Sequence, residues 1–175
     1  MATTVDSTAA REVFVTGLKN AHALEHQAMA LMDRQIEHLA NYAEVEAQLR
    51  AHRGETEGQI RRLETILTNL GESPSGLKDA ALTFSGNMAA LAHTFAPDEV
   101  IKNSFANYAF EHFEIASYRG LIEMAQMAGD QQGVQLLQES LKEEIAMAEW
   151  LSNHLPGTTR AFLDRVAAGD PGAKR

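Results

Sequence analysis

Apolar residues recur at steps of three and four over four long stretches of the chain, which is the period of a helix with one buried face. The first two stretches cover residues 8–40 and 44–70, and the short link at 41–43 makes the two helices antiparallel neighbours. The other two stretches cover residues 98–128 and 131–154. The pattern therefore predicts two helical hairpins.

Glycine and proline mark the ends of these helices. Gly71 suits the left-handed position that follows a helix, and Gly129 turns the chain between the third and fourth helices. Pro156 is expected to end the fourth helix, because proline lacks the backbone donor that a helix interior needs. One short helix is predicted at 77–95, inside the long connection, and another at 158–168.

Two hairpins joined by a long connection are one way to build a four-helix bundle. We predict an all-α, ferritin-like four-helix bundle whose crossover connection carries the short extra helix. The bundle would cover residues 9–168, with a mobile N-terminus at 1–8 and a mobile C-terminal tail at 169–175, because both ends are polar or small. A three-helix or irregular bundle fits the helix lengths less well.

The composition of the chain excludes several classes of function. The formal net charge is −9 and no Lys/Arg stripe could neutralise phosphates, so we expect no nucleic-acid partner. The absence of cysteine excludes thiolate metal sites, iron–sulfur clusters and disulfides. No apolar run is long enough to span a membrane, and the N-terminus does not read as a secretion signal. The expectation is a cytoplasmic protein without a membrane partner.

Glutamates stand in the apolar faces of all four helices. They are Glu25, Glu55, Glu111 with Glu114, and Glu144. A carboxylate that faces a core is costly unless it is paired or coordinated. These faces carry almost no lysine or arginine, so a pair of metal ions is the natural source of positive charge.

The spacing of these acids favours their convergence. The same number of residues separates Glu25 from Glu55 and Glu114 from Glu144, and each pair straddles a tight turn near its midpoint. Residues equidistant from the turn of an antiparallel hairpin lie at one level, so four glutamates would share a layer, with Glu111 one turn away. Taken singly, each of these acids is more often a rim residue or part of an ordinary salt bridge.

Further side chains on these faces could ligate a metal, orient a ligand or simply pack in the core: His22, His52, Gln59, His112, Tyr118 and Glu143. His52 is the imidazole that we assign to the metal site, because it lies three residues before Glu55 on the same helix. Glu143 would replace Glu144 if the helix phase were off by one residue.

Four pieces of the chain carry a family resemblance: Ala23–Gln27, His52–Ile60, Glu111–Tyr118 and Glu139–Glu144. Through them, the chain resembles the YciF/YciE-type bacterial proteins, the DUF892 group of the ferritin-like superfamily, over residues 12–155. The resemblance implies a rubrerythrin-like bundle with a dinuclear, carboxylate-rich metal site. Iron is the first expectation and manganese the alternative. It also implies a homodimer and an association with stress responses.

The chain departs from the wider di-iron pattern on its second and fourth helices. A Glu-x-x-His motif would place histidine where this chain has Gly58 and Met147. Three functions stay open. One is a di-metal oxidoreductase acting on peroxide or O2, which would need an external electron donor because the chain has no cysteine. The others are metal handling, and a stress-associated structural bundle whose metal only stabilises the fold.

Overall fold

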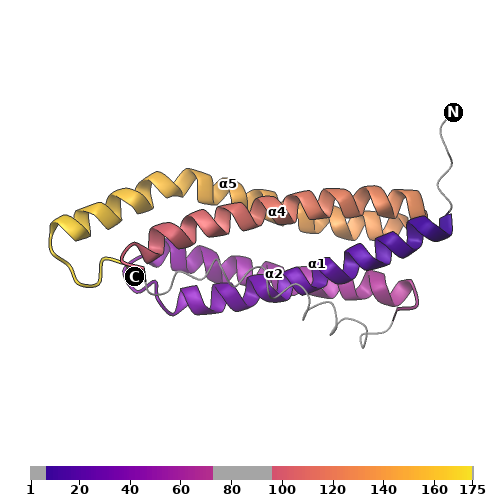
Figure 1. The fold of residues 1–175 in the computed structure, drawn as a ribbon, viewed down its shortest axis with the longest axis horizontal. Helices are drawn as coiled ribbons and strands as arrows, with labels where there is room; N and C mark the ends of the chain where they lie inside the picture. Colours follow the sequence, from indigo (N-terminus) through magenta and orange to yellow (C-terminus); the bar gives the residue numbers. More distant parts are fainter. Residues whose placement is uncertain (1–6, 73–95, 175) are drawn as a thin grey trace.

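The computed structural model describes residues 7–72 and 96–174, which form four long helices (Figure 1). The helices are α1 (Ser7–Ile36), α2 (Ala43–Asn69), α4 (Glu99–Ala128) and α5 (Gln131–Ala167). These described residues contain no strand, so the predicted all-α class is confirmed. The short helix predicted at 77–95 lies outside the described residues.

The four helices form a bundle in which α1 packs against α2 and α4, and α5 packs against α4 and α2. Gln35 of α1 bonds to Asn107 of α4, whereas Gly17 of α1 approaches Leu121 of α4, so these two helices are antiparallel. α2 and α4 therefore run in the same direction, and the end of α2 and the start of α4 lie at opposite ends of the bundle (Figure 1). This is the predicted pair of hairpins with a crossover between them.

Two of the predicted helix ends depend on glycine. Gly71 after α2 has a φ of 77° and Gly129 after α4 has a φ of 78°, a backbone conformation that glycine adopts without strain. Beyond each glycine the chain bonds back to the helix, from Glu72 N to Leu67 O at 2.9 Å and from Asp130 N to Ala125 O at 2.9 Å. These bonds satisfy carbonyls that the helix end would leave open.

The prediction that Pro156 ends the fourth helix is wrong, because α5 continues through it to Ala167. Pro156 and Ser152, whose carbonyl would have bonded to the missing donor, are both exposed, so that carbonyl can bind water instead. The separate helix expected at 158–168 is the last part of α5. Its Phe162 packs against the end of the core.

The core consists of two apolar halves with a polar layer between them. One half contains Phe14, Leu18, Leu63 and Leu121 among others, and lies toward the start of α1. The other half contains Met32, Leu49, Phe110 and Leu151 among others, and lies toward the end of α1. Burial of these side chains from all four helices supplies the main stabilisation of the bundle. The layer between the two halves contains the buried glutamates.

The segment after α5 folds back onto the bundle, where the sequence had predicted a mobile tail. Val100 N bonds to Lys174 O at 3.2 Å, and the Tyr42 hydroxyl donates to Ala173 O at 2.5 Å. Beneath this segment Glu99 is buried, with its carboxylate 2.7 Å from His38 Nδ1 and 3.7 Å from Lys174 Nζ. Hydrogen bonds to the backbone and the ion pair with Glu99 thus hold the C-terminal segment against the bundle, which its polar composition does not indicate.

Replacing Tyr42 with phenylalanine is expected to lower the free energy of unfolding by about 1–3 kcal/mol, because the buried Ala173 carbonyl loses its donor. The measurement is urea unfolding of both proteins. Tyr108→Phe is the matched control, since the Tyr108 side chain is 37% exposed. Equal effects of the two substitutions would mean that the Tyr42 hydroxyl does not hold the C-terminal segment.

Candidate metal centre

Four glutamates from three helices meet in the polar layer of the core. Glu25 of α1 is 1% exposed, Glu111 and Glu114 of α4 are 5% and 1% exposed, and Glu144 of α5 is 0% exposed. Each lies on the buried face of its helix, as the sequence predicted from the apolar period around it. The buried layer thus contains four of the five glutamates that the sequence singled out.

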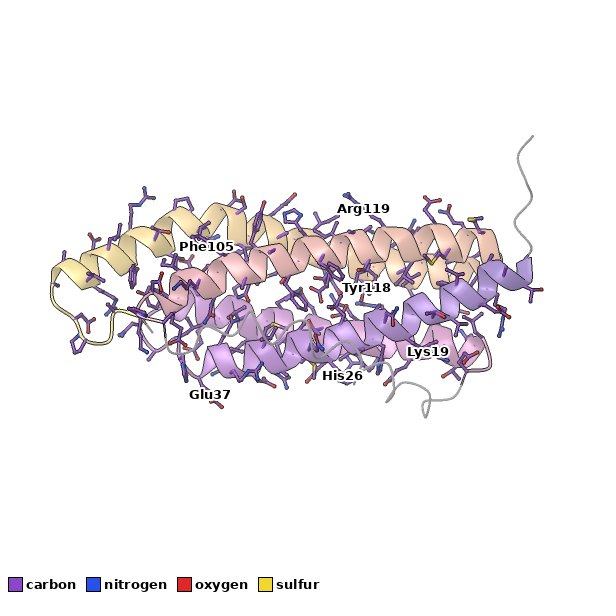
Figure 2. All side chains as sticks on the ribbon, in the orientation of Figure 1. Lys19, His26, Glu37, Phe105, Tyr118 and Arg119 are labelled. Carbon is purple, nitrogen blue, oxygen red and sulfur yellow. The ribbon has the colours of Figure 1, made fainter. Side chains whose placement is uncertain are left out.

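Tyr118 joins α4 to the carboxylate of α1. It follows Glu111 and Glu114 at seven and four residues, so the three side chains share one helix face. The Tyr118 hydroxyl donates to Glu25 Oε1 at 2.5 Å, and its ring is fully buried in the middle of the bundle (Figure 2). This hydrogen bond fixes the orientation of the Glu25 carboxyl group.

The predicted convergence fails for Glu55, whose side chain is 44% exposed. Side chains in a helix lean toward its N-terminus, which means away from the turn in α1 and toward the turn in α2. A side chain of α1 therefore meets a residue of α2 that lies further from the turn than equal spacing suggests. Glu64 accordingly meets His22 at 3.2 Å. In that register Glu25 lies opposite residue 61, and the buried polar side chain nearest that level is Gln59, not Glu55.

α2 therefore supplies His52, Thr56 and Gln59 to the layer, all of them buried. Gln59 donates through Nε2 to Glu144 Oε1, and to Glu143 Oε2 at 3.1 Å. Glu55 keeps a role from outside the core, because its Oε2 lies 2.9 Å from His52 Nδ1. That contact directs the other ring nitrogen of His52 inward.

Three carboxylate and imidazole groups are close enough to hold one metal ion. His52 Nε2 lies 3.3 Å from Glu111 Oε2 and 3.7 Å from Glu144 Oε2. The ligand atoms of all three groups lie within 4.8 Å of one another. Hard and borderline divalent cations accept this combination of carboxylate oxygen and imidazole nitrogen.

Burial and mutual repulsion change the protonation of the glutamates. Burial raises the pKa of Glu25 to about 7 from 4.5, although the hydrogen bond from Tyr118 and the charge of His52 lower it. Burial, together with the charges of Glu25 and Glu144, holds the pKa of Glu114 well above 4.5. For Glu144, burial and the charges of Glu111 and Glu25 raise the pKa well above 4.5. The cluster therefore retains protons where exposed glutamates would have lost them.

His52 is the cation of this cluster among the described residues. Burial alone would lower the pKa of His52, but hydrogen bonds with Glu111 and Glu55 outweigh it and raise the pKa to about 11. One imidazolium cannot neutralise all four glutamates, so the others must keep protons or bind a further cation.

The oxygens of the cluster are under-satisfied. Glu25 Oε2, Glu114 Oε1 and Glu144 Oε2 are buried and receive no hydrogen bond from a nitrogen or hydroxyl donor in the described ranges, which leaves only neighbouring carboxyl groups that keep a proton. A buried acceptor without a donor costs about 1–3 kcal/mol. Oxygens that lack donors, together with the imidazole nitrogen of His52, form a donor set that fits a metal ion.

Other predicted site residues lie elsewhere. Glu143 is bound by Arg62, whose guanidinium reaches its two oxygens at 2.5 and 2.9 Å. His112 is exposed and packs edge-on against Tyr108, so it does not orient a buried ligand. Sequence reasoning missed Arg62. The available signal was its position three residues after Gln59, at the edge of the same face.

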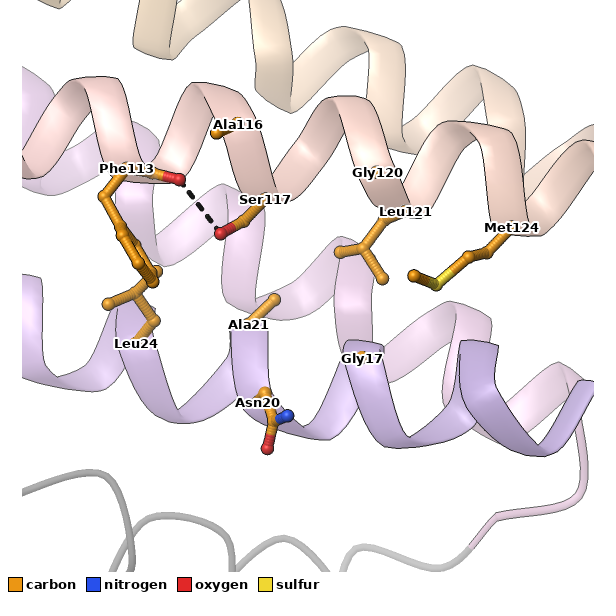
Figure 3. Close-up of a pocket in the computed structure, with 10 residues that line it drawn as sticks. All are labelled: Gly17, Asn20, Ala21, Leu24, Phe113, Ala116, Ser117, Gly120, Leu121 and Met124. Atoms are coloured by element: carbon orange, nitrogen blue, oxygen red, sulfur yellow. Dashed lines mark hydrogen bonds between the residues drawn. The ribbon is translucent and has the colours of Figure 1, made fainter.

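An apolar pocket of about 440 Å³ lies beside the carboxylate layer, on the outer side of the α1–α4 interface (Figure 3). Leu24 and Phe113, the sequence neighbours of Glu25 and Glu114, flank one end of it, and Met124 lies at the other (Figure 3). The described residues that line it include no carboxylate and no imidazole, so it is not a metal site.

The fold and the buried layer define an all-α four-helix bundle with carboxyl groups buried in its core. The family model described as a domain of unknown function, DUF892, matches residues 9–164, and the chain belongs to this family. The resemblance seen in the sequence is thereby confirmed.

Individual relatives agree with this assignment. Protein YciF of Escherichia coli strain K12 is 28% identical over 146 residues, which cover 77% of this chain and 83% of that protein. A crystal structure of a protein from Xanthomonas campestris pv. campestris is similar with a TM-score of 0.76 and 34% identity, covering 91% of this chain and 99% of that one. The crystal structure of the E. coli stress protein YciF matches with a TM-score of 0.67 and 24% identity, covering 89% and 96% of the two chains, and shares the fold.

Within the described residues, no helix is long and apolar enough to cross a lipid bilayer.

Proposed function

We propose that this protein binds two divalent metal ions in its buried carboxylate layer, with iron as the first candidate and manganese as the second. The observation that carries the proposal is the set of buried oxygens on Glu25, Glu114 and Glu144 that no nitrogen or hydroxyl donor among the described residues reaches. Iron and manganese take carboxylate oxygen, and iron also suits imidazole.

Charge and position suggest how the ligands would be shared. His52, Glu111 and Glu144 would hold one ion, and Glu25 and Glu114 are the donors left for a second. Two divalent ions would neutralise the four carboxylates. Glu55 would accept a hydrogen bond from His52 Nδ1–H and leave Nε2 for the metal, which is the usual arrangement behind a metal-bound histidine.

A redox function is the second candidate, and Tyr118 is the observation that favours it. Its phenol is hydrogen-bonded to a proposed ligand, Glu25, inside a water-excluding core. A bound iron or manganese pair would supply reactivity toward peroxide or O2. The chain has no cysteine, so the reducing electrons would come from an external donor. Peroxide consumption by metal-loaded protein, compared with metal-free protein, separates this function from simple metal binding or fold stabilisation.

The proposal is tested by the metal content of protein purified without chelators. We expect about two ions per chain, the stoichiometry of carboxylate-bridged sites in bundle cores. Glu144→Gln should lower the affinity at least about ten-fold, since even outer partners of metal ligands cost about 10–100-fold when removed. Glu149→Gln is the matched control, because Glu149 is exposed on the same helix. Equal metal content in Glu144→Gln and wild-type protein would refute the site, and the solution mass of the same sample tests the proposed homodimer.

A further inference from the structure

A second group of side chains that can bind a metal lies at the edge of the α1–α2 interface, outside the carboxylate layer. His22 and His26 are one helical turn apart, and their rings pack edge-on with centroids 4.6 Å apart. His22 is buried, whereas His26 is exposed on the outside of α1 (Figure 2). Two histidines at this spacing put both imidazoles on one helix face, as in zinc-binding helices. Residues 22–26 in fact read His-Ala-Leu-Glu-His, the spacing of one class of zinc peptidase.

Glu64 of α2 brings a carboxylate to the same place. Its Oε1 lies 3.2 Å from His22 Nε2, and its side chain is 48% exposed. Two atoms that bind a tetrahedral zinc ion, each at about 2.1 Å, are separated by about 3.4 Å. His22 and Glu64 are therefore already at the separation that a shared ion requires, and the exposed His26 can turn toward the same point.

Glu25, the acid between the two histidines in sequence, does not belong to this surface. It is 1% exposed and accepts the Tyr118 hydrogen bond on the core side of α1. The surface group therefore lacks the general base that a peptidase of this spacing uses, and what remains is the capacity to bind a cation.

We propose that His22, His26 and Glu64 form a second metal site, at the surface between α1 and α2, that binds a divalent transition-metal ion such as Zn²⁺. Two imidazoles and one carboxylate leave the fourth tetrahedral position to water, which is accessible because Glu64 and His26 are exposed. The surface site is independent of the buried centre, because the two share no ligand.

The test is a Zn²⁺ titration of chelator-stripped protein at about pH 7.5, where unpaired imidazoles are mostly neutral, followed by ¹H–¹⁵N NMR of the histidine ring nitrogens. We expect the signals of His22 and His26 to shift together and to saturate with the same ion. His26→Ala and Glu64→Gln should each weaken this binding at least about ten-fold. Both side chains are exposed, so the variants should keep the helical circular dichroism of the parent. His112→Ala, which removes another exposed imidazole, is the control and should change nothing.

The same spectra separate the two sites, because His52 reports on the buried centre. Shifts of His22 and His26 without a shift of His52 would support the surface site and contradict the buried one. A shift of His52 alone would overturn the surface site and leave the buried one standing. Unchanged Zn²⁺ affinity in both His26→Ala and Glu64→Gln would also overturn the surface site, since the His22–Glu64 contact would then be an ordinary ion pair.

Discussion

Chelator-treated protein is expected to unfold more easily at about pH 8 than at about pH 5, whereas metal-loaded protein should lose little stability over the same range. Glu25 has a pKa of about 7 in the folded protein, whereas the ordinary pKa of a glutamate, taken for the unfolded chain, is 4.5. The folded protein therefore keeps a proton that the unfolded chain has already released. Wherever the folded state binds more protons, stability falls as the pH rises.

The pH window follows from the two groups with defined shifts. The stability linked to Glu25 is fully present below pH 4.5 and is lost as the pH rises through about 7. A shift of this size corresponds to about 3 kcal/mol. For His52, whose pKa is raised from 6.5 to about 11, the contribution is present below pH 6.5 and is lost as the pH rises through about 11. The contributions of Glu25 and His52 to the stability of the metal-free protein therefore both decrease as the pH rises.

Metal should remove this dependence because ligation requires ionised carboxylates, and an ion that binds the folded state alone stabilises it by mass action. The measurement is a set of thermal melts with and without metal at the two pH values. Glu25→Gln should remove about 2.5 kcal/mol of the pH effect between pH 5 and pH 8 in the chelated protein, and the exposed Glu123→Gln should remove none. Coinciding melts of chelated and loaded protein at both pH values would show that the carboxylates do not bind metal.

Replacing Glu114 with glutamine is expected to act in opposite directions on the two forms of the protein. Without metal at about pH 8, the variant should be more stable than wild type, because glutamine is neutral without a proton, whereas folding must either keep Glu114 protonated or place its charge beside Glu25 and Glu144. With metal, the affinity should fall at least about ten-fold, since a carboxylate ligand is lost. The stabilisation provided by metal should shrink accordingly.

The measurement is the free energy of unfolding of both proteins by urea, with and without added Fe²⁺ or Mn²⁺ under anaerobic conditions. Glu123→Gln, on the same helix but exposed, is the matched control and should leave both values unchanged. A variant that is less stable than wild type in the metal-free form would indicate that Glu114 accepts hydrogen bonds that outweigh its repulsion. A variant with unaltered affinity would remove Glu114 from the ligand set.

Helix type, helix face and three of the four long helices' approximate bounds could be predicted from the sequence, because each depends on residues only a few positions apart. The apolar period predicted the two hairpins, and it placed Glu25, Glu114 and Glu144 on buried faces, where the structure has them. Gly71 and Gly129 predicted two turns, because glycine has no Cβ and adopts a positive φ without strain wherever it stands in the chain. The family resemblance was also readable from short local pieces, of which Glu111–Tyr118 was the most specific.

The tertiary structure decided what depends on how one helix meets another. Equal spacing from a turn placed Glu55 in the layer, but the lean of side chains in the α1–α2 pair brings Gln59 there instead and leaves Glu55 behind His52. The sequence predicted that the last helix ends at Pro156, because proline lacks a backbone donor. The helix continues because the unpaired carbonyl of Ser152 is on an exposed side of α5, where water can bind it. Sequence fixes the phase of a side chain around its own helix, whereas its level against a neighbouring helix depends on packing that only the assembled bundle contains.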